Sequence, residues 1–172
     1  MNPDLAFVFT DSCARRLAQS CSRIAHCLEL LNEEQVWVRG SENENAIGNL
    51  LLHLAGNVRQ WILAGLGGKP DVRVREREFS ARGDIAKADL LERLQTTVDD
   101  ALVVIRKLDG EALARTVKIQ SYQVTALEAV LHVVEHFALH TGQIIFATKM
   151  LTHADLGFYK HLNQPSHQEK TP

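Results

Sequence analysis

Three histidines, His132, His136 and His140, recur at four-residue intervals within a largely apolar segment of the chain. In a helix, each four-residue step rises ~6 Å and turns ~40° about the axis, so two neighbouring imidazoles can point at one metal ion. His132 and His140 would lie ~12 Å apart along that axis, so a single ion would use only one adjacent pair. The spacing leaves open which pair is used, and ordinary hydrogen-bonded histidines are the alternative interpretation.

A third ligand would have to come from another segment, and His53 is the candidate. It lies in an apolar stretch that is expected to be buried, together with Leu50, Leu51, Leu52, Leu54 and Ala55. Taken alone, the position of His53 favours a core histidine. Facing the histidine pair across a helical bundle, it would complete three nitrogen ligands and leave positions open for water or substrate. Asn49 and Asn57, one turn on either side, are candidate hydrogen-bond partners, although helix capping or packing would also explain them.

The segments around these histidines resemble the DinB/YfiT-like superfamily of metalloenzymes. The likeness rests on Asn45-Ala-Ile-Gly-Asn-Leu-Leu-Leu-His53-Leu-Ala-Gly-Asn-Val-Arg-Gln-Trp61 and on His136-Phe-Ala-Leu-His140-Thr-Gly-Gln143-Ile. It also takes in Arg75-Glu-Arg-Glu-Phe79 and covers nearly the whole chain. The resemblance implies an all-α, DinB-like four-helix bundle of the up-down-down-up type with long loops, generally dimeric, that binds a divalent metal. It also implies that the ligands are His53, His136 and His140, and that His132 lies outside the ligand set.

The resemblance further implies a function, because characterised members of the superfamily include metal-dependent transferases and isomerases that use low-molecular-weight thiols. An ion held by three histidines, with open positions, can bind a thiol sulfur and remove its proton at neutral pH. We therefore expect a thiol S-transferase-type enzyme acting on a small thiol and an electrophile, with no catalytic residue assigned beyond the ligands. Zinc, nickel and iron all suit imidazole ligands, so the metal stays open.

Other functions are compatible with the same residues. A metal-binding or stress-related homodimer without turnover is one alternative, and a metal-dependent hydrolase that uses Glu135 or Glu128 as a base is another. His132-Val-Val-Glu135-His136 also matches the His-x-x-Glu-His pattern of inverted zinc peptidases. That interpretation needs a further downstream ligand, and the only glutamate in the 36 residues after His136 is Glu169. The sequence therefore disfavours a peptidase.

Hydrophobic periodicity predicts long helices over residues 4–31, 45–64, 87–108 and 125–151. Thr125 and Glu128 form a capping-box pattern at the start of the last helix. Residues 32–44 are predicted as a loop that places Trp37 against the bundle, and residues 117–124 as an extended connection rather than part of a sheet. Residues 155–162 are expected to form a short extra element. The chain is thus predicted to be one domain over residues 1–162, followed by a polar tail over 163–172.

Residues 65–83 are predicted as a long loop rich in glycine and arginine. Its arginines, at positions 73, 75, 77 and 82, are expected either to form a lid that receives a substrate carboxylate or to be a solvated or dimer-contacting surface. The sequence alone does not separate these two roles.

Composition narrows the classes of partner. The formal net charge is −2 with no long basic run, so nucleic acid is not an expected partner. No apolar stretch approaches the ~20 residues that span a bilayer, and the N-terminal segment does not resemble a signal peptide, so a cytoplasmic protein without a membrane partner is expected. Cys13 and Cys21 would lie ~12 Å apart along one helix, too far for a disulfide, so reduced thiols that are small core or surface residues are expected.

Overall fold

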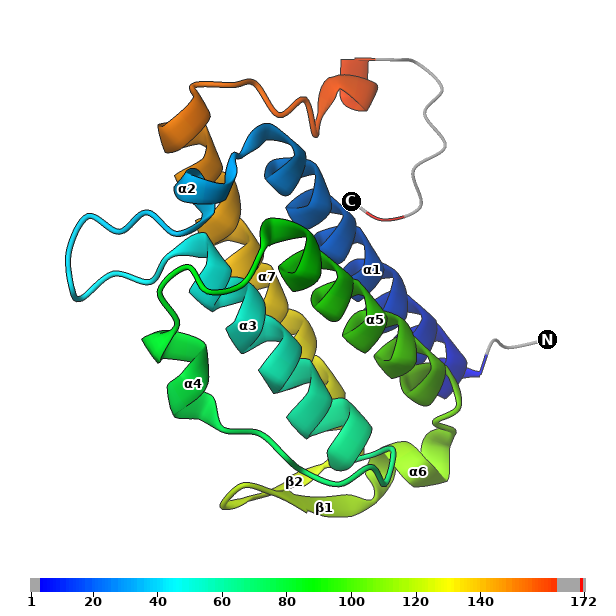
Figure 1. The fold of residues 1–172 in the computed structure, drawn as a ribbon. Helices are drawn as coiled ribbons and strands as arrows, with labels where there is room; N and C mark the ends of the chain where they lie inside the picture. Colours follow the sequence, from blue (N-terminus) through cyan, green and yellow to red (C-terminus); the bar gives the residue numbers. More distant parts are fainter. Residues whose placement is uncertain (1–3, 164–170, 172) are drawn as a thin grey trace.

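Four long helices form the body of the protein in a computed structural model that describes residues 4–163 and 171. They are α1 (Leu5–Leu30), α3 (Ile47–Val58), α5 (Lys87–Arg106) and α7 (Ala126–Thr152). Figure 1 shows α1 and α7 running in one direction and α3 and α5 in the opposite direction. The predicted all-α, four-helix bundle of the up-down-down-up type is therefore confirmed.

Local side-chain contacts define where the principal helices begin. The Asp4 side chain accepts a hydrogen bond from the Ala6 amide at the start of α1. The predicted capping box at the start of α7 is confirmed, because Thr125 and Glu128 each accept a hydrogen bond from the other's backbone amide. These bonds satisfy amide groups that have no partner within the helix, and so they fix the register in which the α7 side chains are presented.

The helix predicted over residues 45–64 consists of α3 followed directly by a π-helical segment, η1 (Arg59–Ala64), with Gly65 as its C-cap. Every residue of α3 is buried, because this helix packs against α5, α7 and the short helix α4 (Arg75–Ser80). The core between the four long helices contains large side chains from all of them, among them Leu17, Ile24, Leu54, Leu94, Ile105 and Phe137. Any polar side chain that points inward from α3 therefore needs a partner within the protein.

The connections differ from the predictions in two places. The predicted loop 32–44 contains the short helix α2 (Glu33–Val36), after which the half-buried Trp37 donates a hydrogen bond from its indole N–H to the Ile85 carbonyl, as its expected packing requires. The prediction of an uninterrupted loop over 65–83 was wrong, because α4 lies inside it. A helix this short gives no periodic signal, and buried contacts of Glu78 hold it against α3.

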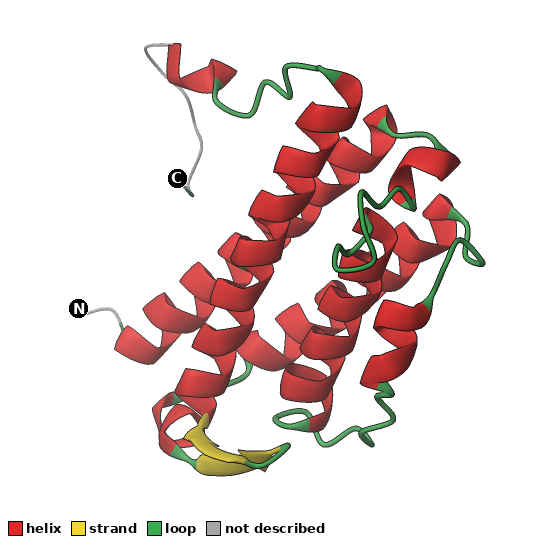
Figure 2. Ribbon diagram, turned by 90° about the vertical axis from the view of Figure 1, so that its left-hand side faces the viewer, coloured by secondary structure: helices red, strands yellow, loops and turns green. Residues whose placement is uncertain are grey.

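The remaining elements lie near the ends of the bundle. After α6 (Gly110–Ala114), the strands β1 (Thr116–Ile119) and β2 (Tyr122–Thr125) form an antiparallel hairpin next to the start of α7, as Figure 2 shows. The predicted extended segment is confirmed, but it does form a small two-stranded sheet. The helix η2 (Lys160–Asn163) overlaps the short element expected at 155–162, while most of the predicted tail lies outside the described residues. Within residues 4–163 and 171, no helix is long and apolar enough to cross a bilayer.

Candidate metal centre

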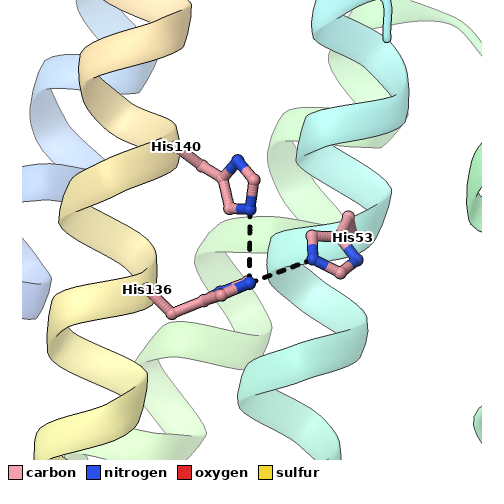
Figure 3. A group of neighbouring side chains, drawn as sticks. All are labelled: His53, His136 and His140. Atoms are coloured by element: carbon pink, nitrogen blue, oxygen red, sulfur yellow. Dashed lines mark hydrogen bonds between the residues drawn. The ribbon is translucent and has the colours of Figure 1, made fainter. Parts of the chain in front are cut away.

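The three histidines predicted as ligands converge on one point between α3 and α7 (Figure 3). The Nε2 atom of His136 lies 3.1 Å from Nε2 of His53 and 3.2 Å from Nε2 of His140. One ring nitrogen from each of the three residues can be chosen so that all three lie within 4.8 Å of one another. His132 is not part of this candidate group.

Helix geometry explains why these positions meet. His136 and His140 are one turn apart on α7, so their side chains stack along the same face of that helix. His53 points toward them from α3, where it is 6% exposed among apolar neighbours. Bringing one buried and two half-buried imidazoles together has a cost that a shared partner would offset.

Glu78 fixes the orientation of His53. The His53 Nδ1 atom lies 3.0 Å from the Glu78 carboxylate, which also accepts two hydrogen bonds, of 2.7 and 2.8 Å, from the Arg73 guanidinium. Burial raises the pKa of Glu78, but hydrogen bonds from Arg73 and His53 together with their positive charges lower it further, so the net pKa lies below its ordinary value. An ionised Glu78 only accepts, and the Arg73 guanidinium, whose Nη2 atom also lies 3.1 Å from His53 Nδ1, only donates. In the tautomer of His53 that donates from Nδ1 to Glu78, the lone pair of Nε2 faces the other histidines.

His140 is oriented in a similar way by a residue of its own helix. Its Nδ1 atom lies 2.7 Å from Oε1 of Gln143, one turn further along α7. With Nδ1 as the donor, Nε2 of His140 also presents a lone pair to the centre. Such contacts to the second ring nitrogen are typical of metal-binding histidines.

The nitrogen positions fit a metal ion. With lone pairs on Nε2 of both His53 and His140, the single Nε2 proton that His136 can carry satisfies one of the two short contacts and leaves the other unfavourable. A cation would satisfy all three. Metal–nitrogen distances of about 2.0–2.1 Å at tetrahedral or octahedral angles give nitrogen separations of about 2.9–3.4 Å, and the two short contacts lie in that range.

The protonation states of the α7 histidines favour neutral rings. Burial, followed by the charges of His140 and His53, lowers the pKa of His136 to about 3. Burial is also the largest cause of the lowered pKa of His140 and of His132. Neutral imidazole is the form that binds a metal, so these rings are in the form that ligation requires.

The two asparagines next to His53 have different roles. The hydrogen bonds of Asn49 go to residues other than the three histidines. Its Oδ1 atom accepts from the Ala46 amide and from Arg39, and its amide group donates to the Glu78 and Ala81 carbonyls. Asn49 therefore anchors α4, and with it Glu78, to the start of α3. Asn57 is also buried, but its Oδ1 atom has no hydrogen-bond partner.

A cleft of about 490 Å³ lies directly beside the histidines. His53 and His136 line it, together with Asn57, Trp61 and His132. Residues of the β hairpin, with Arg75 and Glu128, complete the lining. The candidate metal centre is thus open on one side to a space large enough for a small molecule.

The arginines expected to act together have separate environments. The Arg73 side chain is 4% exposed, and its guanidinium contacts Glu78, Gln60 and Nδ1 of His53. Arg75 lies over the ring of Phe79, while Arg77 and Arg82 are exposed. The role of Glu78 was not predicted from the sequence, because its charged neighbours conceal its burial. Its position in the Arg75–Phe79 segment, which contributed to the family resemblance, was the sequence feature that could have pointed to it.

Solved structures with this fold define the class of protein. A conserved protein from Enterococcus faecalis matches with a TM-score of 0.70 at 14% identity, over 84% of this chain and 98% of that chain. A DinB-like protein (YjoA) from Bacillus subtilis matches with a TM-score of 0.65 at 16% identity, over 86% of this chain and 96% of that chain. The fold is therefore DinB-like. Among curated proteins, none matches the chain.

The sequence itself identifies the family. Residues 4–165 match the family described as "Protein of unknown function (DUF1572)", and the chain belongs to that family.

Proposed function

We propose that this protein binds a divalent transition metal through His53, His136 and His140 and uses it to activate a small thiol for attack on an electrophile. The observation that carries the proposal is the convergence of three Nε2 atoms next to an open cleft. Three protein ligands with space beside them are typical of catalytic rather than structural sites, whose ions are fully enclosed by four ligands.

The protein residues have distinct tasks in this proposal. Glu78 and Gln143 hold the protons of His53 and His140 on Nδ1, so that Nε2 of each ring faces the centre. Arg73 keeps Glu78 ionised, and the buried position of His136 keeps its ring neutral. A bound divalent ion would supply the positive charge that lowers the pKa of a coordinating thiol toward neutral pH. Zinc, nickel and iron are the candidate metals.

The carboxylates of the site support a transferase over a hydrolase. A hydrolase of this kind would need a carboxylate base near the ion. Glu78 is bound to both Arg73 and His53, and Glu128 caps α7 through Thr125. Glu135, the remaining helical candidate, is exposed. The reducing cytoplasm is the proposed location, because Cys13, Cys21 and Cys27 are all free thiols.

A screen of thiol transfer tests the function. Glutathione, bacillithiol, mycothiol and cysteine would each be combined with epoxide and activated-halide electrophiles, using metal-loaded protein, metal-free protein and His140→Ala. We expect a thiol-dependent rate that requires the ion and falls to background in His140→Ala. Replacing all three cysteines by alanine should leave the rate unchanged, because the nucleophile is the added thiol. If no combination exceeds the metal-free background, the transferase proposal fails and a non-catalytic metal-binding protein becomes the better account.

A further inference from the structure

Three buried polar atoms of residues that line the cleft have no hydrogen-bond partner among the described residues. They are Nδ1 of His136, whose other ring nitrogen is assigned to the ion, and, beyond the metal ligands, Oδ1 of Asn57 and Nε2 of His132. Asn57 is only 5% exposed, and Asn57 and His132 both line the cleft beside the metal centre. A buried polar atom without a hydrogen bond costs roughly 1–3 kcal/mol, so a native protein that keeps two of them in one cleft indicates a ligand that pairs with them.

The antiparallel arrangement of α3 and α7 places these two residues at the same level of the bundle. Asn57 follows His53 by four residues on α3, and His132 precedes His136 by four residues on α7. Because the two helices run in opposite directions (Figure 1), both steps lead the same way from the centre, by ~6 Å along the axis. Asn57 and His132 thus form a second polar layer, one helical turn from the metal ligands.

Trp61 holds this layer in place. Trp61 follows Asn57 by four residues and lies in η1, which continues α3. Its ring centroid is 4.2 Å from that of His132, and the two ring planes are inclined by 40°. This contact fixes the His132 ring without using its Nε2 atom. A neutral imidazole carries a proton on one of its two nitrogens, so Nε2 of His132 can act as a donor.

We propose that Asn57 and His132 recognise an amide group of the thiol substrate, with the amide N–H donating to Asn57 Oδ1 and the amide carbonyl accepting from His132 Nε2. A primary amide presents an N–H donor next to its carbonyl acceptor, which matches the unpartnered atoms of Asn57 and His132. The inference rests on the proposed function, because the sulfur of the same molecule is assigned to the ion. A thiol whose amide is separated from sulfur by two methylene groups has about the right reach for a ~6 Å step.

Binding of two matched probes to cobalt-loaded protein tests this assignment without an activity assay. The probes are 3-mercaptopropionamide and methyl 3-mercaptopropionate, which have the same chain and carbonyl group but differ in the N–H donor. Cobalt(II) reports its own coordination through visible absorption, and thiol ligation adds a sulfur-to-metal charge-transfer band. Titration of that band gives the dissociation constant of each probe.

We expect the wild-type protein to bind the amide roughly tenfold more tightly than the ester, as one buried hydrogen bond would give. Asn57→Leu should remove this preference, whereas Asn57→Asp, which retains an acceptor, should keep it. His132→Phe retains a ring against Trp61 and should weaken both probes alike, because both have the carbonyl. Asn45→Leu, at an exposed asparagine before α3, is the matched control and should behave as wild type.

The outcomes separate the two proposals. Failure of the wild-type protein to bind cobalt at the histidines would overturn the proposed function and this inference with it. If cobalt and both thiols bind but the wild-type protein does not discriminate between them, or if folded, cobalt-loaded Asn57→Leu still prefers the amide, only the inference is overturned. Circular dichroism and the cobalt spectrum of each variant identify any loss of fold, and Asn57→Asp provides the second, milder substitution.

Discussion

Three cysteines and three histidines of this protein are both potential sets of metal ligands, but only the histidines lie close together. Cys13, Cys21 and Cys27 lie along α1, and all three are buried as free thiols. The histidine triplet is divided between α3 and α7 and converges. Both cysteine and histidine bind transition metals, so residue type alone does not distinguish the two groups.

The difference lies in how the positions are distributed over the helices. The cysteines are separated by eight and six residues on a single helix, or ~12 and ~9 Å along its axis, so they cannot meet. Burial raises the pKa of each thiol, to about 11 for Cys21, where the charge of Asp99 adds to the effect. The cysteines thus act as small core residues. Convergence requires an adjacent pair on one helix and a third residue on its neighbour, as the histidines have.

The largest expected effect is on metal content. His53→Ala, His136→Ala and His140→Ala should each abolish stoichiometric binding, because each removes one of three ligands. Alanine replacement of all three cysteines should leave one ion per chain, as elemental analysis after dialysis would show. His132→Ala, on the same face of α7, is the matched control and should retain most of the metal. If His53→Ala still bound one metal ion per chain, the assignment of the histidines as the ligands would be wrong.

Much of this contrast is predictable from the sequence, for identifiable reasons. The long helices have strong periodic patterns, and the four-residue spacing on α7 indicates a ligand pair. Spacing did not choose between His132 and His140, because both pairs have the same local geometry, and the family resemblance supplied that choice.

Other parts were not predictable because they depend on tertiary contacts. α4 has only six residues, and Glu78 is buried despite its charged neighbours. The pairing of Glu78 with His53 across 25 positions of sequence leaves no local pattern. The unpartnered Oδ1 of Asn57 likewise becomes apparent only when the surrounding side chains are placed.

A smaller but still large effect is expected from Glu78→Gln. A neutral amide no longer provides the carboxylate that orients His53, so metal affinity should fall by roughly 10–100-fold, measured by competition with a chelator. Glu76→Gln, at an exposed acid in the same short helix, is the control and should bind as wild type. Equal affinities for the two folded variants would show that the Glu78 contact does not support the site.

The two triplets should affect the stability of the fold at opposite ends of the pH range, the histidines at acid pH and the cysteines at alkaline pH. In the metal-free protein, the pKa of His136 is about 3, against 6.5 for an unperturbed histidine. Below pH 6.5 the unfolded chain therefore binds a proton that the folded chain does not, so stability falls as the pH is lowered from 6.5 toward 3. The lowered pKa of Glu78 adds to this loss below its ordinary value of 4.5. In urea unfolding, His136→Phe should lose less stability than the wild type as the pH is lowered, because the variant lacks this histidine.

The cysteines should act at the other end of the pH range. The raised pKa of Cys21 means that the folded chain retains a proton that the unfolded chain loses above pH 9. Its contribution to stability is present below pH 9 and is lost as the pH rises through about 11. Cys21→Ala should therefore flatten the alkaline side of the same urea profile and leave the acid side unchanged. A change on the acid side instead would contradict the separation of the two triplets.

Substitutions in either triplet should have their smallest effect on the oligomeric state. We propose that the protein is a homodimer, as the family resemblance implies, with a mass in light scattering near twice 19.2 kDa. Neither His53→Ala nor the cysteine-free variant should change this mass, because the proposed ion lies within one bundle. A wild-type monomer at high micromolar concentration would refute the dimer, and dissociation of His53→Ala alone would indicate that the ion contributes to assembly.

Anomalous diffraction at the absorption edge of the bound metal is the most direct test of the convergent histidine site. Crystals of untagged protein loaded with one equivalent of ion should give one strong peak per chain, at about 2.0–2.1 Å from Nε2 of His53, His136 and His140. A peak at the α1 cysteines, or the absence of any peak between α3 and α7 at full loading, would contradict the account.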